Sequence, residues 1–221
     1  MGPAASLPSP GLLESLAPLR PAPLCPELRA HQAGDVFALW RAWEQESGAE
    51  QGVPFWTIVW PAAAALARLI LDSGLDVAGK RLLEVGCGSA VAAIAASRAG
   101  AAAVTANDIS PAALFVARAN AEANNALLRF SPDNLIASAA PVDTDIALLA
   151  DLFYERPVAE QTLAWLRRVR RPGMQVIVAD AGRPFAPRER LTVLHEVDVP
   201  VNADLEGVAA RHVIIGQLDL A

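Results

Sequence analysis

The residues of this 221-residue chain that are best suited to chemistry lie in a glycine-rich turn and an acid that follows it. Residues 81–85 form a short apolar run, which leads into the turn Gly86-Cys87-Gly88. Residues 90–98 have the composition of a helix, and a second apolar run, 102–106, leads to Asp108. This order predicts a strand, a glycine loop, a helix and a second strand with an acid at its end. Such a unit suits a ligand whose sugar hydroxyls meet the acid while its other end crosses the glycine turn.

The charge near the turn decides between two classes of ligand. A dinucleotide site requires Gly-x-Gly-x-x-Gly, but Val91 stands at the third glycine position. Glu84 directs a negative charge toward the place of a pyrophosphate, which costs about 3 kcal/mol at about 5 Å and an effective dielectric of about 20. S-adenosylmethionine is cationic at its sulfonium and ammonium groups, and its ribose offers a diol to Asp108. We therefore favour S-adenosylmethionine; a glycine turn that binds no ligand remains the alternative.

Composition limits the class of protein. Acidic residues outnumber basic ones by 24 to 18, for a net charge of −6, which argues against nucleic-acid binding. The two cysteines make neither a disulfide framework nor a zinc site, and the three histidines lack metal-ligand spacing, so we expect no metal. The most apolar stretch is too short to cross a membrane, and the N-terminus does not resemble a secretory signal. We expect a cytoplasmic protein that does not bind membranes.

The order of apolar runs predicts the fold class. After the first two strands, five more are expected at 127–131, 145–150, 175–180, 191–199 and 209–218. Predicted helices separate the early strands, whereas the last two strands nearly abut. The pattern is typical of an α/β fold with a seven-stranded, mostly parallel, doubly wound sheet that ends in an antiparallel hairpin.

The N-terminal part of the chain differs in composition. Residues 1–26 hold seven of the 17 prolines, which predicts an extended or disordered leader before a single domain at 27–221. Residues 30–50 have apolar side chains at helical spacing, and the aromatic stretch 52–61 has the character of a strand. In that helix, the tryptophans are best explained by core packing.

Acids follow several of the predicted strands, where a doubly wound sheet places its functional groups. Asp133, which precedes Asn134, either accepts a hydrogen bond from an adenine amino group or is a turn residue after proline. Asp151 follows a buried strand, and Tyr154 is the only tyrosine in the chain. If a helix begins at once, this spacing brings both side chains to one face.

Methyl transfer to an amine gives this acid and tyrosine a role. Deprotonation of lysine at pH 7 costs about 4.6 kcal/mol, and a dry aromatic pocket with one carboxylate would hold and steer the amine. Trp60, Phe153 and Tyr154 could form its walls. The alternative is that Asp151 caps a helix and the aromatic residues belong to the core.

Several stretches, in the same order, resemble a known family. LLEVGCGSA and AVTANDIS resemble the first two motifs of the seven-stranded S-adenosylmethionine-dependent methyltransferases. PFWTIVWPAAAALARLILD, ADLFYERPVAEQTLAWLRR and VADAGRPFAPRERL resemble, more narrowly, the electron transfer flavoprotein β-subunit lysine methyltransferases and their bacterial homologues. The similarity extends from about residue 24 to the C-terminus.

The resemblance implies roles for individual residues. Asp151 and Tyr154 would match the Asp-x-x-Tyr motif of the acceptor pocket. The residues expected to contact the methyl donor are Trp60, Glu84, Gly86, Cys87, Gly88, Asp108, Ile109, Asp133 and Asn134. The partner would be a protein, such as an electron transfer flavoprotein subunit.

The sequence also departs from the family pattern, notably at Ala90, where the family has glycine, and at Ala62-Ala63, where it has two glycines. The family's Gly-Asp-Pro-Gly-Arg loop appears here as Ala179-Asp180-Ala181-Gly182-Arg183. Two alternatives therefore stay open: an N-methyltransferase of small-molecule amines, of the nicotinamide type, and a donor-binding protein without activity.

Overall fold

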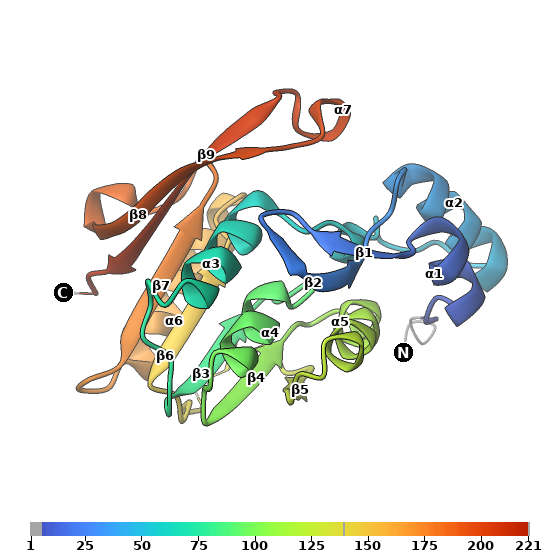
Figure 1. Cartoon of the computed structure of the whole chain (residues 1–221). Coiled ribbons are helices and arrows are strands. Elements are labelled where there is room, and N and C mark those ends of the chain that lie inside the picture. Colours follow the sequence, from blue (N-terminus) through green and yellow to red (C-terminus); the bar gives the residue numbers. More distant parts are fainter. Residues whose placement is uncertain (1–5, 139, 221) are drawn as a thin grey trace.

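A seven-stranded sheet forms the centre of the computed structural model, which describes residues 6–138 and 140–220 (Figure 1). The order of its strands is β5-β4-β3-β6-β7-β9-β8. The strands are β3 (Arg81–Val85), β4 (Ala103–Asn107), β5 (Arg129–Ser131), β6 (Ile146–Ala150), β7 (Gln175–Asp180), β8 (Leu191–Pro200) and β9 (Ala210–Leu218).

The strand directions match the predicted fold class. The strands from β5 to β7 are parallel, whereas β9 is antiparallel to both of its neighbours, β7 and β8. The predicted mostly parallel, doubly wound sheet with an antiparallel hairpin at its end is therefore confirmed. Val85 pairs with Asn107 on one side and with Leu149 on the other, so the carboxyl ends of the three central strands lie level.

Helices cover both faces of the sheet. The helices are α3 (Pro61–Leu71), α4 (Val91–Arg98), α5 (Pro111–Ala123) and α6 (Arg156–Val169). The first three share one apolar cluster with alternate residues of the strands, such as Leu82 and Leu148. On the other face, Trp165 and Leu166 of α6 pack against the intervening residues. This alternation follows from the period of two of a strand buried on both faces.

The N-terminal segment contains a helix and two strands. It forms α1 (Pro10–Leu16) and a two-stranded antiparallel sheet of β1 (Leu19–Ala22) and β2 (Cys25–His31). The expected extended or disordered leader thus differs from the structure, and its boundary at residue 26 falls inside β2; residues 1–5 lie outside the described residues. Ser9 caps α1 by accepting from the Leu12 N–H, with proline in the first turn, so this proline favours the helix.

Two asparagines hold β2 to the main body: Asn120 in α5, and Asn124 at the C-terminal cap of this helix. The Asn120 amide accepts from the His31 N–H at 2.8 Å and donates to the Ser89 carbonyl at 3.0 Å. The Asn124 amide accepts from the Arg29 N–H at 2.9 Å and donates to the Arg29 carbonyl at 2.6 Å. The N-terminal sheet is therefore joined, through Asn120, to the glycine-rich loop.

The segment between β2 and α3 differs from its prediction in two ways. The helix predicted at 30–50 is the shorter α2 (Val36–Ser47), and residues 52–61 contain no strand but a single 3₁₀ turn, η1 (Phe55–Thr57). The side chain of Trp56 packs edge-on against Trp43 of α2, with ring centroids 5.5 Å apart. Trp43 packs in the core as predicted, whereas Trp40 is only half-buried.

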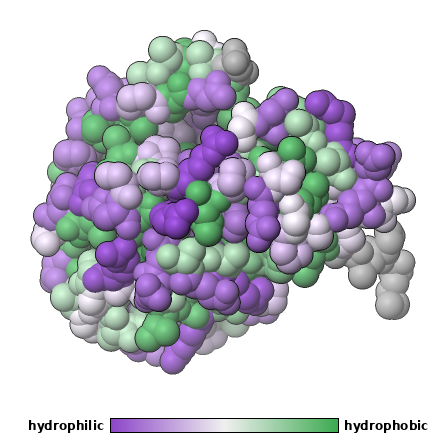
Figure 2. Space-filling model, turned by 45° about the vertical axis from the view of Figure 1, so that its right-hand side comes forward, coloured by the Kyte–Doolittle hydropathy of each residue, from purple (hydrophilic) through white to green (hydrophobic). Residues whose placement is uncertain are grey.

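The outer surface is mixed in character. On the face seen in Figure 2, hydrophobic and hydrophilic residues are interspersed, and a notch separates the lobe that carries α1 and α2 from the main body. None of the helices in the described ranges is both long enough and apolar enough to cross a membrane.

Candidate functional site

The glycine-rich loop lies between β3 and α4 and has an unusual backbone. Gly86 and Gly88 have φ angles of +66° and +49°, which favour glycine, and Ala90 also has a positive φ of +59°. A Cβ at position 86 would come within 2.9 Å of Leu152 Cδ1, which is the movable end of a side chain, so the positive φ rather than the space favours glycine there. The loop therefore keeps its backbone accessible for a ligand.

Asp108 joins this loop to the end of β4. Its Oδ2 accepts from the Gly88 N–H at 3.0 Å, and its Oδ1 accepts from the Ser110 N–H at 2.9 Å. Burial raises the pKa of this carboxyl, while the two N–H groups act in the opposite direction. Each oxygen retains a lone pair for a further hydrogen bond, as a ribose diol requires. Beside it, Ile109 is 67% exposed and offers an apolar surface to a ring.

Glu84 does not direct a charge toward the loop, contrary to the argument made from the sequence. Its side chain is buried and accepts from the Ala93 N–H in the first turn of α4 at 2.9 Å. Burial raises its pKa to about 8, so most of the carboxyl is protonated at pH 7. The case against a pyrophosphate therefore no longer includes this charge and depends on Val91 at the position of the third glycine.

Cys87 is a buried part of the loop rather than a reactive group. Its backbone N–H donates to the Asn107 carbonyl of β4 at 2.9 Å, and its side chain is only 4% exposed. Burial, together with the nearby acids, raises the pKa of the thiol, so it stays protonated. A role of Cys87 in donor binding is thus limited to its backbone and the volume of its side chain.

Asp133 and Asn134 lie beyond the end of β5, next to β4. The Asp133 carboxylate accepts from the Ser131 hydroxyl at 2.9 Å, and Asn134 accepts from the Ala137 N–H at 3.1 Å. Asn107 donates to the carbonyls of both Ser131 and Asp133 at 2.9 Å, so it holds this loop close to Asp108. Both predicted side chains are exposed, and their contact with adenine stays a prediction.

Asp151 lies at the end of β6 and connects three elements. Its Oδ2 accepts from the Ala62 N–H of α3 at 3.2 Å, and its Oδ1 accepts from the Ala181 N–H at 3.1 Å and from Arg183 Nε at 2.9 Å. Burial raises the pKa of this carboxyl, while Arg183 acts against the shift. The backbone has a φ of +53°, a strained conformation for aspartate that persists where the surrounding structure enforces it.

Tyr154 does not share a helical face with Asp151. The chain from 151 to 155 is irregular, and α6 begins only at Arg156, so the condition for the predicted pairing is not met. The Tyr154 side chain is 53% exposed. Partial burial raises the pKa of its phenol, and the negative charges of Glu155 and Asp108 act in the same direction.

Trp60 precedes α3 and packs against a cation of this chain. The guanidinium carbon of Arg183 lies 5.2 Å from the centre of its ring, and Phe55 packs edge-on at 5.8 Å. Arg183 also donates to Glu206 of α7 (Ala203–Glu206) at 3.4 Å. Trp60, Asp151, Arg183 and Glu206 thus form one polar cluster at the carboxyl edge of the sheet.

Some residues of this region carry no recognisable signal in the sequence. Trp56 and Leu152 approach the glycine loop, with the Trp56 Cα 4.0 Å from a Cβ built on Gly88. Glu206 reaches the cluster only because the hairpin of β8 and β9 folds back. Glu206 is 55 positions away from Asp151 in the sequence, so only the pairing of the strands could have indicated their contact with the same arginine.

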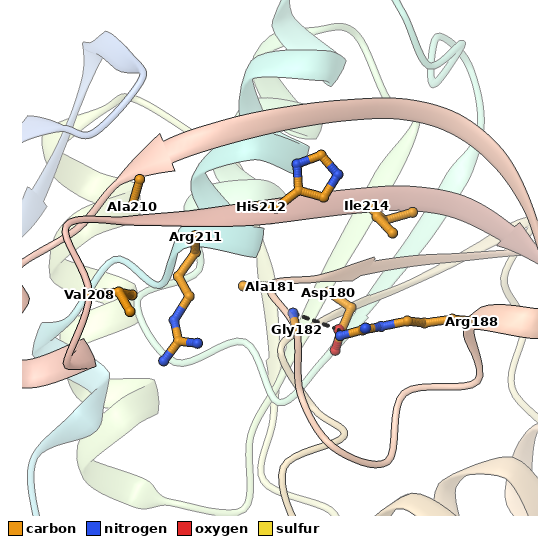
Figure 3. Close-up of a pocket in the computed structure, with 9 residues that line it drawn as sticks. All are labelled: Asp180, Ala181, Gly182, Arg188, Val208, Ala210, Arg211, His212 and Ile214. Carbon is orange, nitrogen blue, oxygen red and sulfur yellow. Dashed lines mark hydrogen bonds and ion pairs between the residues drawn. The ribbon is translucent and has the colours of Figure 1, made fainter.

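A pocket of about 260 Å³ adjoins this cluster at the end of β7 (Figure 3). Its polar lining includes Asp180, whose Oδ1 accepts from the Gly182 N–H at 2.9 Å and from Arg188 at 3.4 Å. The other oxygen of Asp180 is buried and has no hydrogen-bond partner among the described residues. In the same described part of the chain, no three acids, histidines or cysteines are grouped so that they could hold a metal ion.

Comparison with known proteins agrees with this geometry. The family described as ribosomal protein L11 methyltransferase (PrmA) matches residues 65–152, which include the glycine loop, Asp108 and Asp151. The N-methyltransferase NodS from Bradyrhizobium japonicum, solved with S-adenosyl-L-homocysteine, has the same fold, with a TM-score of 0.53 at 16% identity over 72% of this chain and 88% of NodS.

Two curated relatives are more similar in sequence. The electron transfer flavoprotein beta subunit lysine methyltransferase of Xenopus laevis is 39% identical over 73% of this chain and 65% of the frog protein. The mouse protein of the same name is 32% identical over 80% of this chain and 71% of its own length. The chain thus spans about two-thirds of the length of these relatives. It belongs to the S-adenosylmethionine-dependent methyltransferases, in the family of the electron transfer flavoprotein beta subunit lysine methyltransferases.

Proposed function

We propose that this protein transfers a methyl group from S-adenosylmethionine to the side-chain amine of a protein lysine. The observation that carries the proposal is the position of Asp108, which bonds the Gly88 N–H and retains lone pairs for a ribose diol. Asp151 directly follows β6, the strand that pairs with β3 and so lies beside the glycine loop. A donor and an acceptor site thus meet at one edge of the sheet.

The chemistry of the residues around the glycine loop suits the donor. The glycines at 86 and 88 let a ligand approach the main chain, and exposed Ile109 offers an apolar contact beside Asp108. Burial raises the pKa of Glu84 to about 8, and a cationic donor beside it would favour its charged form. We assign the ribose to Asp108, and the adenine to the side of Ile109, Asp133 and Asn134.

The acceptor side favours a macromolecule over a small amine. Tyr154 is 53% exposed, and Glu155 next to it is exposed as well, so the rim is acidic and accessible. A small-molecule enzyme would be expected to enclose its substrate instead. Since relatives of this family are named for it, an electron transfer flavoprotein β subunit is the first candidate acceptor. The cytoplasmic location stays a prediction.

The test is methylation of a defined acceptor. Purified protein is incubated with isotopically labelled S-adenosylmethionine and with the electron transfer flavoprotein β subunit, and peptides are analysed by mass spectrometry. We expect label on lysine residues of the acceptor. Donor binding without a methylated product, on this acceptor or on nicotinamide-type amines, would support the alternative of a binding protein without activity.

A further inference from the structure

We propose that the guanidinium of Arg183 occupies the binding site of the acceptor amine when no acceptor is bound. The site is a cation site formed by Asp151, Glu206 and the ring of Trp60. The inference rests on the proposed function, because it assumes that the acceptor is an amine. It adds to that function a defined position for the amine and a residue of this chain that must leave it.

Arg183 contacts two carboxylates and an aromatic ring, which are groups that also bind an ammonium ion. Its Nε lies 2.9 Å from Asp151 Oδ1, and one of its terminal nitrogens lies 3.4 Å from Glu206 Oε1. Its central carbon lies 5.2 Å from the centre of the Trp60 ring, within the range of a cation–π interaction. The side chains of both acids are only 5% exposed, so their attraction for a cation is weakly screened.

The charges of the cluster favour exchange of one cation for another. Glu206 has a second partner, Arg211, whose Nε lies 2.8 Å from Oε2. Asp151 has only Arg183 as a charged partner among the described residues. Departure of Arg183 alone would leave Asp151 as an unpaired buried charge, which is strongly unfavourable. An incoming amine that replaces Arg183 avoids this penalty, and the arginine then returns when the product leaves.

The backbone at Arg183 is held in place, while its side chain can rotate and has open space beside it. It follows Gly182, whose φ is +92°, and its backbone N–H is held by Asp180 at 3.0 Å, so the side chain can turn while the loop stays. The pocket of Figure 3 begins at Gly182, and its lining includes Arg188 and Arg211. The displaced guanidinium can turn into this space, where the two other arginines make it less favourable than the position between Asp151 and Glu206.

The site also fits the chemistry of transfer. The lysine nitrogen loses a proton to water and then forms a bond to the methyl carbon, while the carbon–sulfur bond breaks and leaves its electron pair on sulfur. The methylated nitrogen is again a cation, which Asp151 and Trp60 retain until it exchanges with Arg183. The aromatic ring and the carboxylate thus position the nitrogen before and after the reaction.

The first test measures binding without the methyl donor. The probe is n-butylammonium chloride, which mimics the end of a lysine, and the readout is the rise in Tm relative to equal concentrations of potassium chloride. If Arg183 fills the site in all but about one-tenth of molecules, its removal in R183Q raises the apparent affinity about tenfold. The matched control is R68Q, which removes an arginine paired with Glu27 and Asp72 at the end of α3 far from Trp60, and it should leave the affinity for the probe unchanged.

The second test uses a lysine in place of the arginine. In R183K the charge is kept, so the buried acid remains paired and folding is preserved. We expect the variant to methylate itself at position 183 when labelled S-adenosylmethionine is added, as seen by mass spectrometry. R188K, with a lysine on the same loop outside the cluster, should not be labelled.

The outcomes separate this inference from the proposed function. If the wild type methylates its acceptor while R183K stays unlabelled and R183Q binds the probe no better, Arg183 is a structural brace and the inference is wrong. If no amine is methylated by any form, including R183K, the proposed function fails, and this inference with it. Labelling of R183K together with tighter probe binding to R183Q supports both.

Discussion

At the scale of single residues, Asp151 combines a structural and a chemical position. Its carboxylate accepts from the backbone of α3 and of the loop after β7, and it pairs with Arg183. This acid thus holds β6, α3 and the loop after β7 together. Its two roles can be separated, because donor binding and transfer depend on different contacts.

Replacement of Asp151 by asparagine should reduce turnover more than donor affinity. The amide would keep an oxygen for one of the two backbone N–H groups, those of Ala62 and Ala181, but lose the charge that steers a cationic acceptor. We expect a fall in kcat/KM of at least about tenfold, or about 1.4 kcal/mol. Donor affinity is measured by calorimetry and turnover with labelled donor. Equal losses in both quantities would show that Asp151 is only structural.

Glu84 predicts a pH dependence of stability. Because its pKa is about 8 in the folded protein and near 4.5 without burial, the folded chain keeps a proton that the unfolded chain releases. The free energy of unfolding should therefore fall as pH rises from about 4.5 to about 8. Urea unfolding at several pH values measures this slope.

The matched variant Glu84→Gln preserves an oxygen for the Ala93 N–H but cannot ionise. We expect a smaller fall in stability over the same pH range, so that the variant exceeds the wild type at pH 8. The pKa values of Asp108 and Asp151 are also raised by burial, so the stability of E84Q should still fall with rising pH, but less steeply than that of the wild type. An unchanged slope in E84Q would mean that Glu84 is ionised in the folded protein.

At the scale of elements, the junction of the glycine loop and α4 has a residue that departs from the family pattern. Ala90 caps α4 with a φ of +59° and is fully buried. An alanine in this conformation costs roughly 1–2 kcal/mol, while burial of its methyl group contributes about 0.8 kcal/mol. The loop is thus closed by a strained residue whose side chain is still used in packing.

The substitution Ala90→Gly should change stability little, because relief of strain and loss of the methyl group oppose each other. We expect a change in the free energy of unfolding below about 1 kcal/mol. Ala95→Gly, equally buried within α4, should cost about 2 kcal/mol, since helix propensity and lost burial add there. Similar losses at both positions, measured by urea unfolding, would contradict the account of Ala90.

The attachment of the N-terminal sheet gives another prediction for an element. Asn120 is fully buried and bonds His31 of β2 on one side and Ser89 of the glycine loop on the other. Asn120→Ala leaves these two backbone groups without partners and should cost about 2–4 kcal/mol. Gln161→Ala on the exposed face of α6 is the control and should cost less than about 0.5 kcal/mol. Equal values for both would mean that the N-terminal sheet is only loosely attached.

The elements also show what a sequence can and cannot reveal. The core strands were predictable because buried parallel strands are short apolar runs, and β7 matches the predicted range 175–180. The N-terminal sheet was not, because proline suggests disorder although Pro10 begins α1 and Pro21 lies in β1 of a two-stranded sheet. The stretch 52–61 has the aromatic composition of a strand but forms none, because Trp56 packs on α2 and approaches the glycine loop.

The candidate site shows the same division. Gly86, Gly88 and Asp108 were predictable because one local unit contains them all and brings them together. The charge of Glu84 was not, since its burial depends on the packing of α4 over β3. The spacing of Asp151 and Tyr154 predicts a shared helical face, but α6 begins only at Arg156, after an irregular segment. The Glu206 contact depends on the whole hairpin.

At the scale of the whole molecule, the sheet brings together two sites that are distant in the sequence. The register of β3 with β4 and β6 sets the glycine loop between Asp108 and the Asp151 cluster. The donor side belongs to the first half of the sheet, while the hairpin of β8 and β9 contributes Glu206 to the acceptor side. The account therefore predicts that donor binding depends on Asp108 and is independent of the hairpin.

The most direct measurement is a crystal structure with S-adenosyl-L-homocysteine, together with calorimetric titration of wild type and Asp108→Ala. The account predicts the ribose on Asp108 and the ligand across Gly86–Gly88, and a loss of about 2 kcal/mol, or about thirtyfold in Kd, in the variant. Asp76→Ala, in an exposed pair with Lys80 remote from the loop, should bind as the wild type does. A loop filled by side chains, a phosphate in place of the ligand, or unchanged affinity in D108A would contradict the account.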